Sequence, residues 1–160
     1  MKITITKKEH RNRLACERAD GTSVTADLGP GLPHHDLAHY VVEKQLGLKG
    51  GFFGNIAHGY SIAQLSDKDV IKSLGAESWI AEILARALQS LSSGACTTAQ
   101  FPELVNLELA NLSIADLNKL DAGTIERMYL EFRVLLERYR LLKNGEALEF
   151  EFAEGEPERA

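Results

Sequence analysis

Cysteine, proline and tryptophan are scarce in this chain of 160 residues, which contains 2 cysteines, 4 prolines and 1 tryptophan. Two cysteines are too few for the disulfide framework of a small secreted domain, so we expect Cys16 and Cys96 to be free, buried thiols. No apolar run approaches the roughly 18–20 residues that a membrane-spanning helix needs. Residues 1–6 alternate in polarity and lack the continuous apolar core of a signal peptide. We therefore expect a cytoplasmic protein with no membrane partner.

An excess of positive charge is also absent, because the formal net charge is -5. Nucleic-acid phosphates attract lysine and arginine, so we do not expect nucleic acid as the main partner. The charge is unevenly spread, with basic residues gathered in 1–18 and glutamates in 146–158. Opposite charges on neighbouring strands attract each other. The sequence therefore predicts that the two ends of the chain pair side by side.

The length and the 44% apolar content suit one domain with its own hydrophobic core. Alternating polarity predicts four strands, which cover 2–7, 11–18, 22–28 and 147–152. Between the second and the third strand, Asp20-Gly21 predicts a tight hairpin turn, because glycine accepts a positive φ without steric cost. We expect one domain over 1–153, followed by a frayed acidic tail at 154–160.

Apolar residues at helical spacing occupy the middle of the chain. Three longer helices are predicted over 34–46, 76–91 and 124–143. Two short helical segments are also predicted, one opened by Ser66 as N-cap and one from about Ser113 to Leu120. Gly47 ends the first helix, and Gly50–Gly59 is expected to be an irregular loop. Strands followed by helices and a final strand indicate an α+β fold. The N-terminal hairpin strands and the C-terminal strand would form an antiparallel sheet, packed by several helices on one side.

The predicted helix 34–46 carries four polar side chains on one face, namely His35, Asp36, His39 and Glu43. At about 100° per residue they fall within one arc, away from the apolar stripe of the same helix. Histidines at i and i+4 bring both imidazoles to one side and can chelate Zn²⁺ or another divalent metal. A third ligand would be Glu43, one turn further on, or His58 in the glycine-rich loop.

The aromatic pair Phe52 and Phe53 in the same loop would form the wall of a pocket for a small ligand or metal. The stretch His35-Asp36-Leu37-Ala38-His39 is similar to the His-Glu-x-x-His helix of zinc metallopeptidases, with aspartate in place of glutamate. In those enzymes the glutamate is the general base acting on the metal-bound water. Metal-assisted hydrolysis is the reaction class that this similarity suggests, with His39 and Asp36 as candidate catalytic residues.

Two other interpretations of this polar face stay open. The first is acid–base catalysis without a metal, in which His39 is the base and Glu43 or Asp36 orients it. The second is a structural role, in which the histidines pair with carboxylates on the same helix. Sequence alone does not choose among the three.

A longer motif surrounds this face, namely HDLxHYVVE at 35–43, LGL at 46–48 and GFFG at 51–54. This combination resembles a group of short bacterial proteins with no established activity, which also start with a hairpin and end in a strand after a long helix. The resemblance implies a bacterial, cytosolic protein of one domain. It adds no mechanism.

A non-enzymatic interaction or structural module is the alternative hypothesis for function. The predicted helix 124–143 repeats apolar residues at spacings of three and four, which suits either packing within the domain or a homodimer. Exposed aromatic rings at Phe52 and Phe53 would be another surface for a partner.

Overall fold

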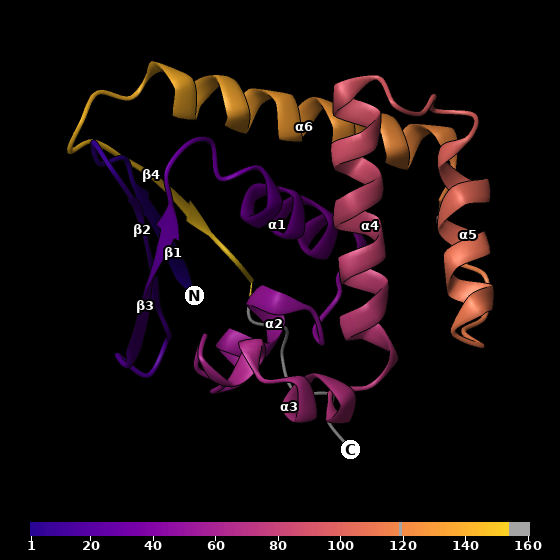
Figure 1. Ribbon diagram of the computed structural model, residues 1–160, viewed down its shortest axis with the longest axis horizontal. Helices are drawn as coiled ribbons and strands as arrows, with labels where there is room; N and C mark the ends of the chain where they lie inside the picture. Colours follow the sequence, from indigo (N-terminus) through magenta and orange to yellow (C-terminus); the bar gives the residue numbers. More distant parts are fainter. Residues whose placement is uncertain (119, 154–160) are drawn as a thin grey trace.

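The computed structural model describes residues 1–118 and 120–153. Within them, a four-stranded antiparallel sheet lies beside a group of helices (Figure 1). The strands are β1 (Lys2–Thr6), β2 (Asn12–Glu17), β3 (Ser23–Gly29) and β4 (Ala147–Glu151), in the spatial order β3-β2-β1-β4. The helices are α1 (His34–Leu46), α2 (Phe52–Ala57), the short 3-10 helix η1 (Gln64–Ser66), α3 (Lys68–Ser73), α4 (Ala76–Ser93), α5 (Phe101–Asn111) and α6 (Ala122–Leu141). The predicted α+β fold, with its helices on one side of the sheet, is confirmed.

The sheet has one face turned towards the helices, because alternate residues of each strand point to the same side. In β1, Ile3 and Ile5 are fully buried, and they lie opposite Cys16 and Leu14 of β2. On the other side of β1, Ile5 lies opposite Leu148 of β4, which is also buried. These residues form the floor on which the helices pack.

The two ends of the chain lie side by side as predicted, since β1 pairs antiparallel with β4. The Nζ of Lys2 lies 3.4 Å from Oε2 of Glu149 on the exposed face of this pair. An exposed ion pair of this kind contributes at most about 1 kcal/mol. The ladder of backbone hydrogen bonds therefore holds the ends together more than the charges do. The predicted tail at 154–160 lies outside the described residues.

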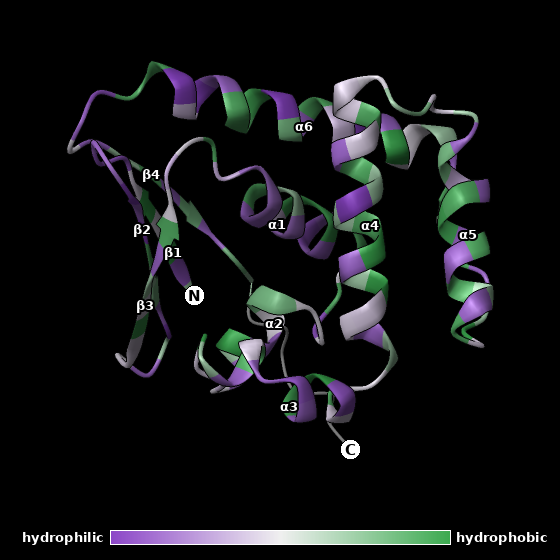
Figure 2. Ribbon diagram, in the orientation of Figure 1, coloured by the Kyte–Doolittle hydropathy of each residue, from purple (hydrophilic) through white to green (hydrophobic). Residues whose placement is uncertain are grey.

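Helix α1 is the central helix, packed against the sheet, α4 and α6 (Figure 1). Its apolar residues Leu37 and Val41 are fully buried, and the ring of Tyr40 lies 4.2 Å from the ring of Phe150 in β4. The helix ends at Gly47 in the left-handed conformation, as predicted. Hydrophobic and hydrophilic residues alternate along α1 and α4 in Figure 2, which is typical of helices that bury one face.

The segment 50–59 differs from its prediction, because residues Phe52–Ala57 form helix α2 rather than an irregular loop. The sheet holds the end of this helix through Arg18. Its Nε donates a hydrogen bond of 2.6 Å to the carbonyl of Ile56, and its Nη2 donates one of 2.9 Å to the carbonyl of Tyr60. These tertiary contacts stabilise a helix that would be too short to persist alone.

The region after α2 also corrects two predictions. The N-cap of α3 is Asp67 rather than Ser66, and its carboxylate accepts the backbone N–H groups of Asp69 and Val70. Helix α5 was not predicted, and the described part of 113–120 contains no helix. This segment packs back on α5, where the side chain of Asn106 accepts the N–H of Leu117 at 3.2 Å.

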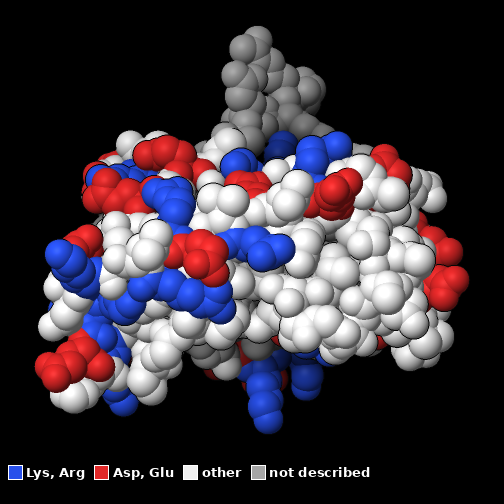
Figure 3. Space-filling view, turned by 90° about the horizontal axis from the view of Figure 1, so that it is seen from above, with Lys and Arg blue, Asp and Glu red and all other residues white. Residues whose placement is uncertain are grey.

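Helix α6 packs on α1 and α4, where Met128 and Phe132 are fully buried. Its opposite face carries three exposed apolar side chains, namely Leu130, Val134 and Leu141. Figure 3 views this side of the molecule and shows charges of both signs gathered towards the sheet, with a less charged area towards α5. The homodimer suggested by the sequence of this helix stays a prediction.

Both cysteines are free and buried, as predicted. Burial raises the pKa of Cys16 to about 12 and also raises the pKa of Cys96, so neither thiol is disposed to act as a nucleophile. None of the helices in 1–118 and 120–153 combines the length and apolarity needed to cross a membrane.

Candidate metal centre

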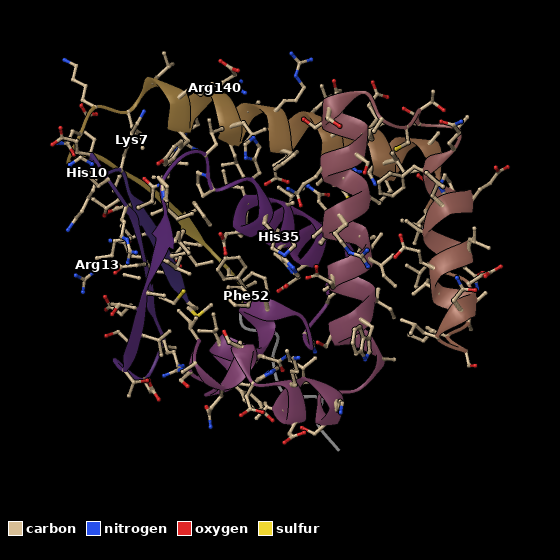
Figure 4. The ribbon with its side chains drawn as sticks, in the orientation of Figure 1. Lys7, His10, Arg13, His35, Phe52 and Arg140 are labelled. Atoms are coloured by element: carbon tan, nitrogen blue, oxygen red, sulfur yellow. The ribbon has the colours of Figure 1, made fainter. Side chains whose placement is uncertain are left out.

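Two histidines of α1 and one glutamate of α4 converge on a single point. The Nε2 atoms of His35 and His39 lie 3.2 Å and 2.9 Å from the same atom, Oε2 of Glu82. Among the described residues, these three form the one group of His, Cys, Asp and Glu whose ligand atoms all lie within 4.8 Å of one another. Figure 4 shows His35 in the space between α1 and α4.

The separations within this group suit a small divalent ion. In a tetrahedral site, bonds of about 2.0–2.1 Å from a metal to nitrogen and oxygen place neighbouring ligand atoms about 3.3–3.4 Å apart. The distances from histidine nitrogen to Glu82, 3.2 Å and 2.9 Å, are somewhat shorter than this. The rings of His35 and His39 meet edge to face, with centroids 4.7 Å apart. A small shift of the side chains would therefore place an ion between the three ligand atoms.

Glu43 lies behind His39 rather than beside it. The Nδ1 of His39 donates to Oε1 of Glu43 at 3.2 Å, and the glutamate is fully buried. The same carboxylate accepts the backbone N–H groups of Phe53 at 3.3 Å and Gly54 at 3.0 Å. Since its oxygens are occupied in this way, Glu43 orients His39 and leaves Nε2 as the nitrogen that faces Glu82.

His35 is held by the same type of contact. Its Nδ1 donates to Oε1 of Gln89 on α4, at 3.0 Å, which leaves its Nε2 facing Glu82. Histidine ligands of metals almost always donate their other ring N–H to such an acceptor, which fixes the orientation of the ring. On the remaining side of Glu82, Oε1 lies 3.6 Å from Nε of Arg86. Each of the three ligand side chains therefore has a partner that orients it.

Two glycines of the GFFG motif stand where no side chain fits, and Gly51 makes room for the carboxylate of Glu43. A Cβ atom placed on Gly51 would lie 2.3 Å from both Cδ and Oε1 of Glu43. A Cβ atom on Gly54 would lie 2.3 Å from the backbone oxygen of Lys49. Side-chain carbons do not approach other atoms so closely, so only glycine fits at either position. The glycine motif thus supports His39 through Glu43.

The three candidate ligand side chains line a pocket of about 350 Å³. Its polar residues are His35, Asp36, His39, Asn55, Ser78 and Glu82. Its apolar wall is formed by Phe52 of α2, Leu65 of η1, Ile71 and Leu74 at α3, and Trp79 of α4. Binding pockets for small molecules have this size and this combination of an apolar wall with a few converging polar groups.

Electrostatics couple the three ligands strongly. Burial lowers the pKa of His39, but its hydrogen bonds to Glu43 and Glu82 outweigh burial and raise the pKa to about 9. The hydrogen bond to Glu82 also raises the pKa of His35, and the two histidines hold the pKa of Glu82 well below its usual range. Burial raises the pKa of Asp36, which is opposed by the nearby histidines. Without a metal, these shifts favour protonated histidines beside an ionised Glu82.

The structure brings together part of the site that the sequence predicted. His35, His39 and Asp36 share the pocket, and Phe52 lines its wall. Phe53 is fully buried in the core and is not among the pocket residues. The other two predicted ligands are Glu43, which lies behind His39, and His58, which is exposed just after α2 and outside the ligand group.

Sequence reasoning missed Glu82 and Gln89. A weak signal was present, because Glu82, Arg86 and Gln89 are spaced by four and three residues and so share one face of the amphipathic helix α4. That spacing does not say which element the polar face meets. The packing of α4 on α1 decides it.

No family model, curated protein or solved structure matches this chain. The candidate centre is therefore described from the chemistry of its own residues alone.

Proposed function

We propose that the protein binds a divalent transition-metal ion through His35, His39 and Glu82, and that the pocket holds a small substrate for metal-assisted hydrolysis. The observation that carries the proposal is the shared direction of the two Nε2 atoms. Both histidines use Nδ1 to contact an acceptor and point Nε2 at one oxygen of Glu82. Imidazole and carboxylate ligands suit Zn²⁺, with Fe²⁺ as the other common occupant of such a set.

A catalytic role is favoured over a structural one by the number of ligands. Structural zinc sites are closed by four protein ligands, whereas catalytic sites use three and keep a position open for water or substrate. The group has three members and borders the pocket. A metal here would lower the pKa of a bound water and polarise a carbonyl group of the substrate. Asp36 lines the same pocket and is the residue we assign to proton transfer.

Acid–base catalysis without a metal is less well supported. A general base works best when its pKa lies near the operating pH. The pKa of His39 is raised to about 9, so this ring is protonated at neutral pH and cannot accept a proton. The proposed metal centre does not need His39 as a base, because the ion displaces the proton from Nε2 and His39 then acts as a ligand.

The experiment that tests the proposal is metal analysis of the protein purified without an affinity tag, followed by Zn²⁺ titration of the metal-free form in a calorimeter. We expect one ion per chain. Loss of the hydrogen-bond partner of a ligand lowers metal affinity by roughly 10–100-fold. Glu82→Gln and His39→Ala change the proposed ligands themselves, so each should lower Zn²⁺ affinity by more than this. Circular dichroism would establish that both variants keep their helices.

His58→Ala is the matched control, since it removes an exposed histidine outside the ligand group. It should bind Zn²⁺ as the wild type does. Absence of stoichiometric binding in the wild type, or equal binding by Glu82→Gln, would refute the metal centre. Weaker binding by His58→Ala would show instead that this residue completes the site, as one sequence hypothesis had it.

A further inference from the structure

The chemistry of the pocket lining narrows the class of substrate. The pocket lining combines apolar side chains with a group of polar ones, and none of its described lining residues is lysine or arginine. Proteins recognise phosphates and carboxylates largely through arginine, lysine and clustered backbone N–H groups. The charged or titratable residues of the lining are His35, Asp36, His39 and Glu82. Of these, the histidines and Glu82 are committed to one another or to the metal.

Arg86 is a cation beside the group, and both of its partners are carboxylates. Its Nε lies 3.6 Å from Oε1 of Glu82, and its Nη2 donates to Oε2 of Glu108 at 2.9 Å. The side chain is thus held between two carboxylates and is not among the pocket residues. Besides the metal, or the two histidines that pair with Glu82 in the metal-free form, an anionic substrate would find no cation in the described lining.

We infer that the pocket takes an uncharged substrate, an ester or amide that carries an aromatic or branched alkyl group. The apolar group lies against Phe52, Ile71 and Trp79, and the carbonyl oxygen faces the ligand group. The inference rests on the proposed metal centre for the position of the carbonyl. The preference for an apolar, uncharged body rests on the lining alone. A volume of about 350 Å³ is sufficient for a small molecule of this kind.

The wall can be altered without disturbing the core. Ile71 belongs to α3, a helix that contains no buried residue. Ile71 lines the pocket whereas its neighbour Val70 does not, although both are partly exposed. Ile71→Lys therefore places a positive charge on the pocket side of α3. Val70→Lys places the same charge on the same helix, away from the pocket.

Trp79 supplies the signal for the test. It is the one tryptophan of the chain, it lines the pocket, and its side chain is 38% exposed. The first probe is N-phenyl-1-naphthylamine, an uncharged aromatic amine, added to the metal-free protein. We expect saturable quenching of Trp79 emission at one probe per chain. Ile71→Lys should weaken binding by more than about tenfold, whereas Val70→Lys should leave it unchanged, and a large excess of inorganic phosphate should not displace the probe.

The second arm uses the zinc-loaded protein and two hydroxamates with the same chelating head. Octanohydroxamate should bind more tightly than acetohydroxamate by more than about tenfold, because its chain lies on the apolar wall. Equal affinity of the two, or displacement of the first probe by phosphate, would overturn the inference.

The two arms separate this inference from the proposed function. If the naphthylamine binds in the pocket but Zn²⁺ does not bind, the metal centre and the placement of the carbonyl are overturned, and the apolar preference stands. If Zn²⁺ binds but the naphthylamine does not, or binds Ile71→Lys equally well, the substrate class is overturned and the metal centre stands.

Discussion

Glu43 and Gly51 touch so closely that no side chain fits between them: a Cβ atom on Gly51 would lie 2.3 Å from the carboxyl carbon of Glu43. The glutamate in turn accepts the Nδ1–H of His39 at 3.2 Å. The two sequence motifs, one rich in histidine and the other in glycine, are therefore parts of one structure. The glycines after α1 determine where its histidine points.

Adding one methyl group at Gly51 should test this relationship. Gly51→Ala would force the buried carboxylate of Glu43 away from its three donors, and overpacking of this kind costs about 1–3 kcal/mol. We expect a lower midpoint of urea unfolding and weaker Zn²⁺ binding. Gly123→Ala is the control, because its Cβ would meet no atom closer than 3.5 Å and alanine favours helix. A Gly51→Ala variant as stable as Gly123→Ala would contradict the argument.

The contact between Gln89 and His35 predicts opposite effects for two substitutions. Gln89→Leu removes the acceptor for Nδ1 of His35 and should weaken metal binding by roughly 10–100-fold. Gln89→Glu keeps an acceptor, makes it a carboxylate and should strengthen binding, since a carboxylate increases the basicity of a histidine ligand. Calorimetric titration of both variants measures the difference. Binding that changes in the same direction in both would show that Gln89 does not act through His35.

The raised pKa of His39 predicts how the stability of the metal-free protein depends on pH. Its folded-state pKa is about 9 against an ordinary value of 6.5, so the folded state binds the proton more tightly. The resulting stabilisation is complete below pH 6.5 and is lost as the pH rises through about 9. Urea unfolding in the presence of a chelator should show this decline in the wild type. His39→Gln should show a smaller decline, because the pKa of His35 is raised too, whereas His58→Ala should retain the decline in full.

The same proton competes with the metal, so zinc affinity should rise with pH while the stability of the metal-free protein falls. Between pH 6.5 and about 9, binding must displace the proton from Nε2 of His39, and affinity should rise with pH across this range. Zinc-loaded protein should therefore gain stability relative to the metal-free form as the pH rises. Constant zinc affinity across this range would indicate that His39 is not a ligand.

A hydrogen bond between α6 and the sheet predicts a purely structural effect. The hydroxyl of Tyr139 donates to Oδ1 of Asn12 in β2, and both residues are buried. Tyr139→Phe leaves this oxygen without its donor and should lower the free energy of unfolding by about 1–3 kcal/mol. Zinc affinity should not change. Tyr129→Phe on the same helix is the control, because that ring is more exposed and should have little effect.

Local patterns were sufficient for most of the secondary structure. Alternation in 2–7 and 147–152 indicated strands, the Asp20-Gly21 pair indicated a hairpin, and Gly47 marked the end of α1; all of these agree with the structure. The errors came where local signals are weak. Helix α2 depends on contacts with Arg18 and Glu43, and residues 101–111 were not recognised as a helix.

The sequence by itself determined that His35 and His39 lie on one face of a helix, since a helical turn of 3.6 residues brings positions i and i+4 together. Only the tertiary structure decided the rest of the site. The candidate ligand Glu82 comes from α4, 43 residues after His39, while Glu43, one turn away, lies behind the histidine. Helical spacing places side chains on a face, but it does not say which helix that face will meet. That is decided by the packing of α1 and α4 around the shared apolar core, which sets the distance between their polar side chains.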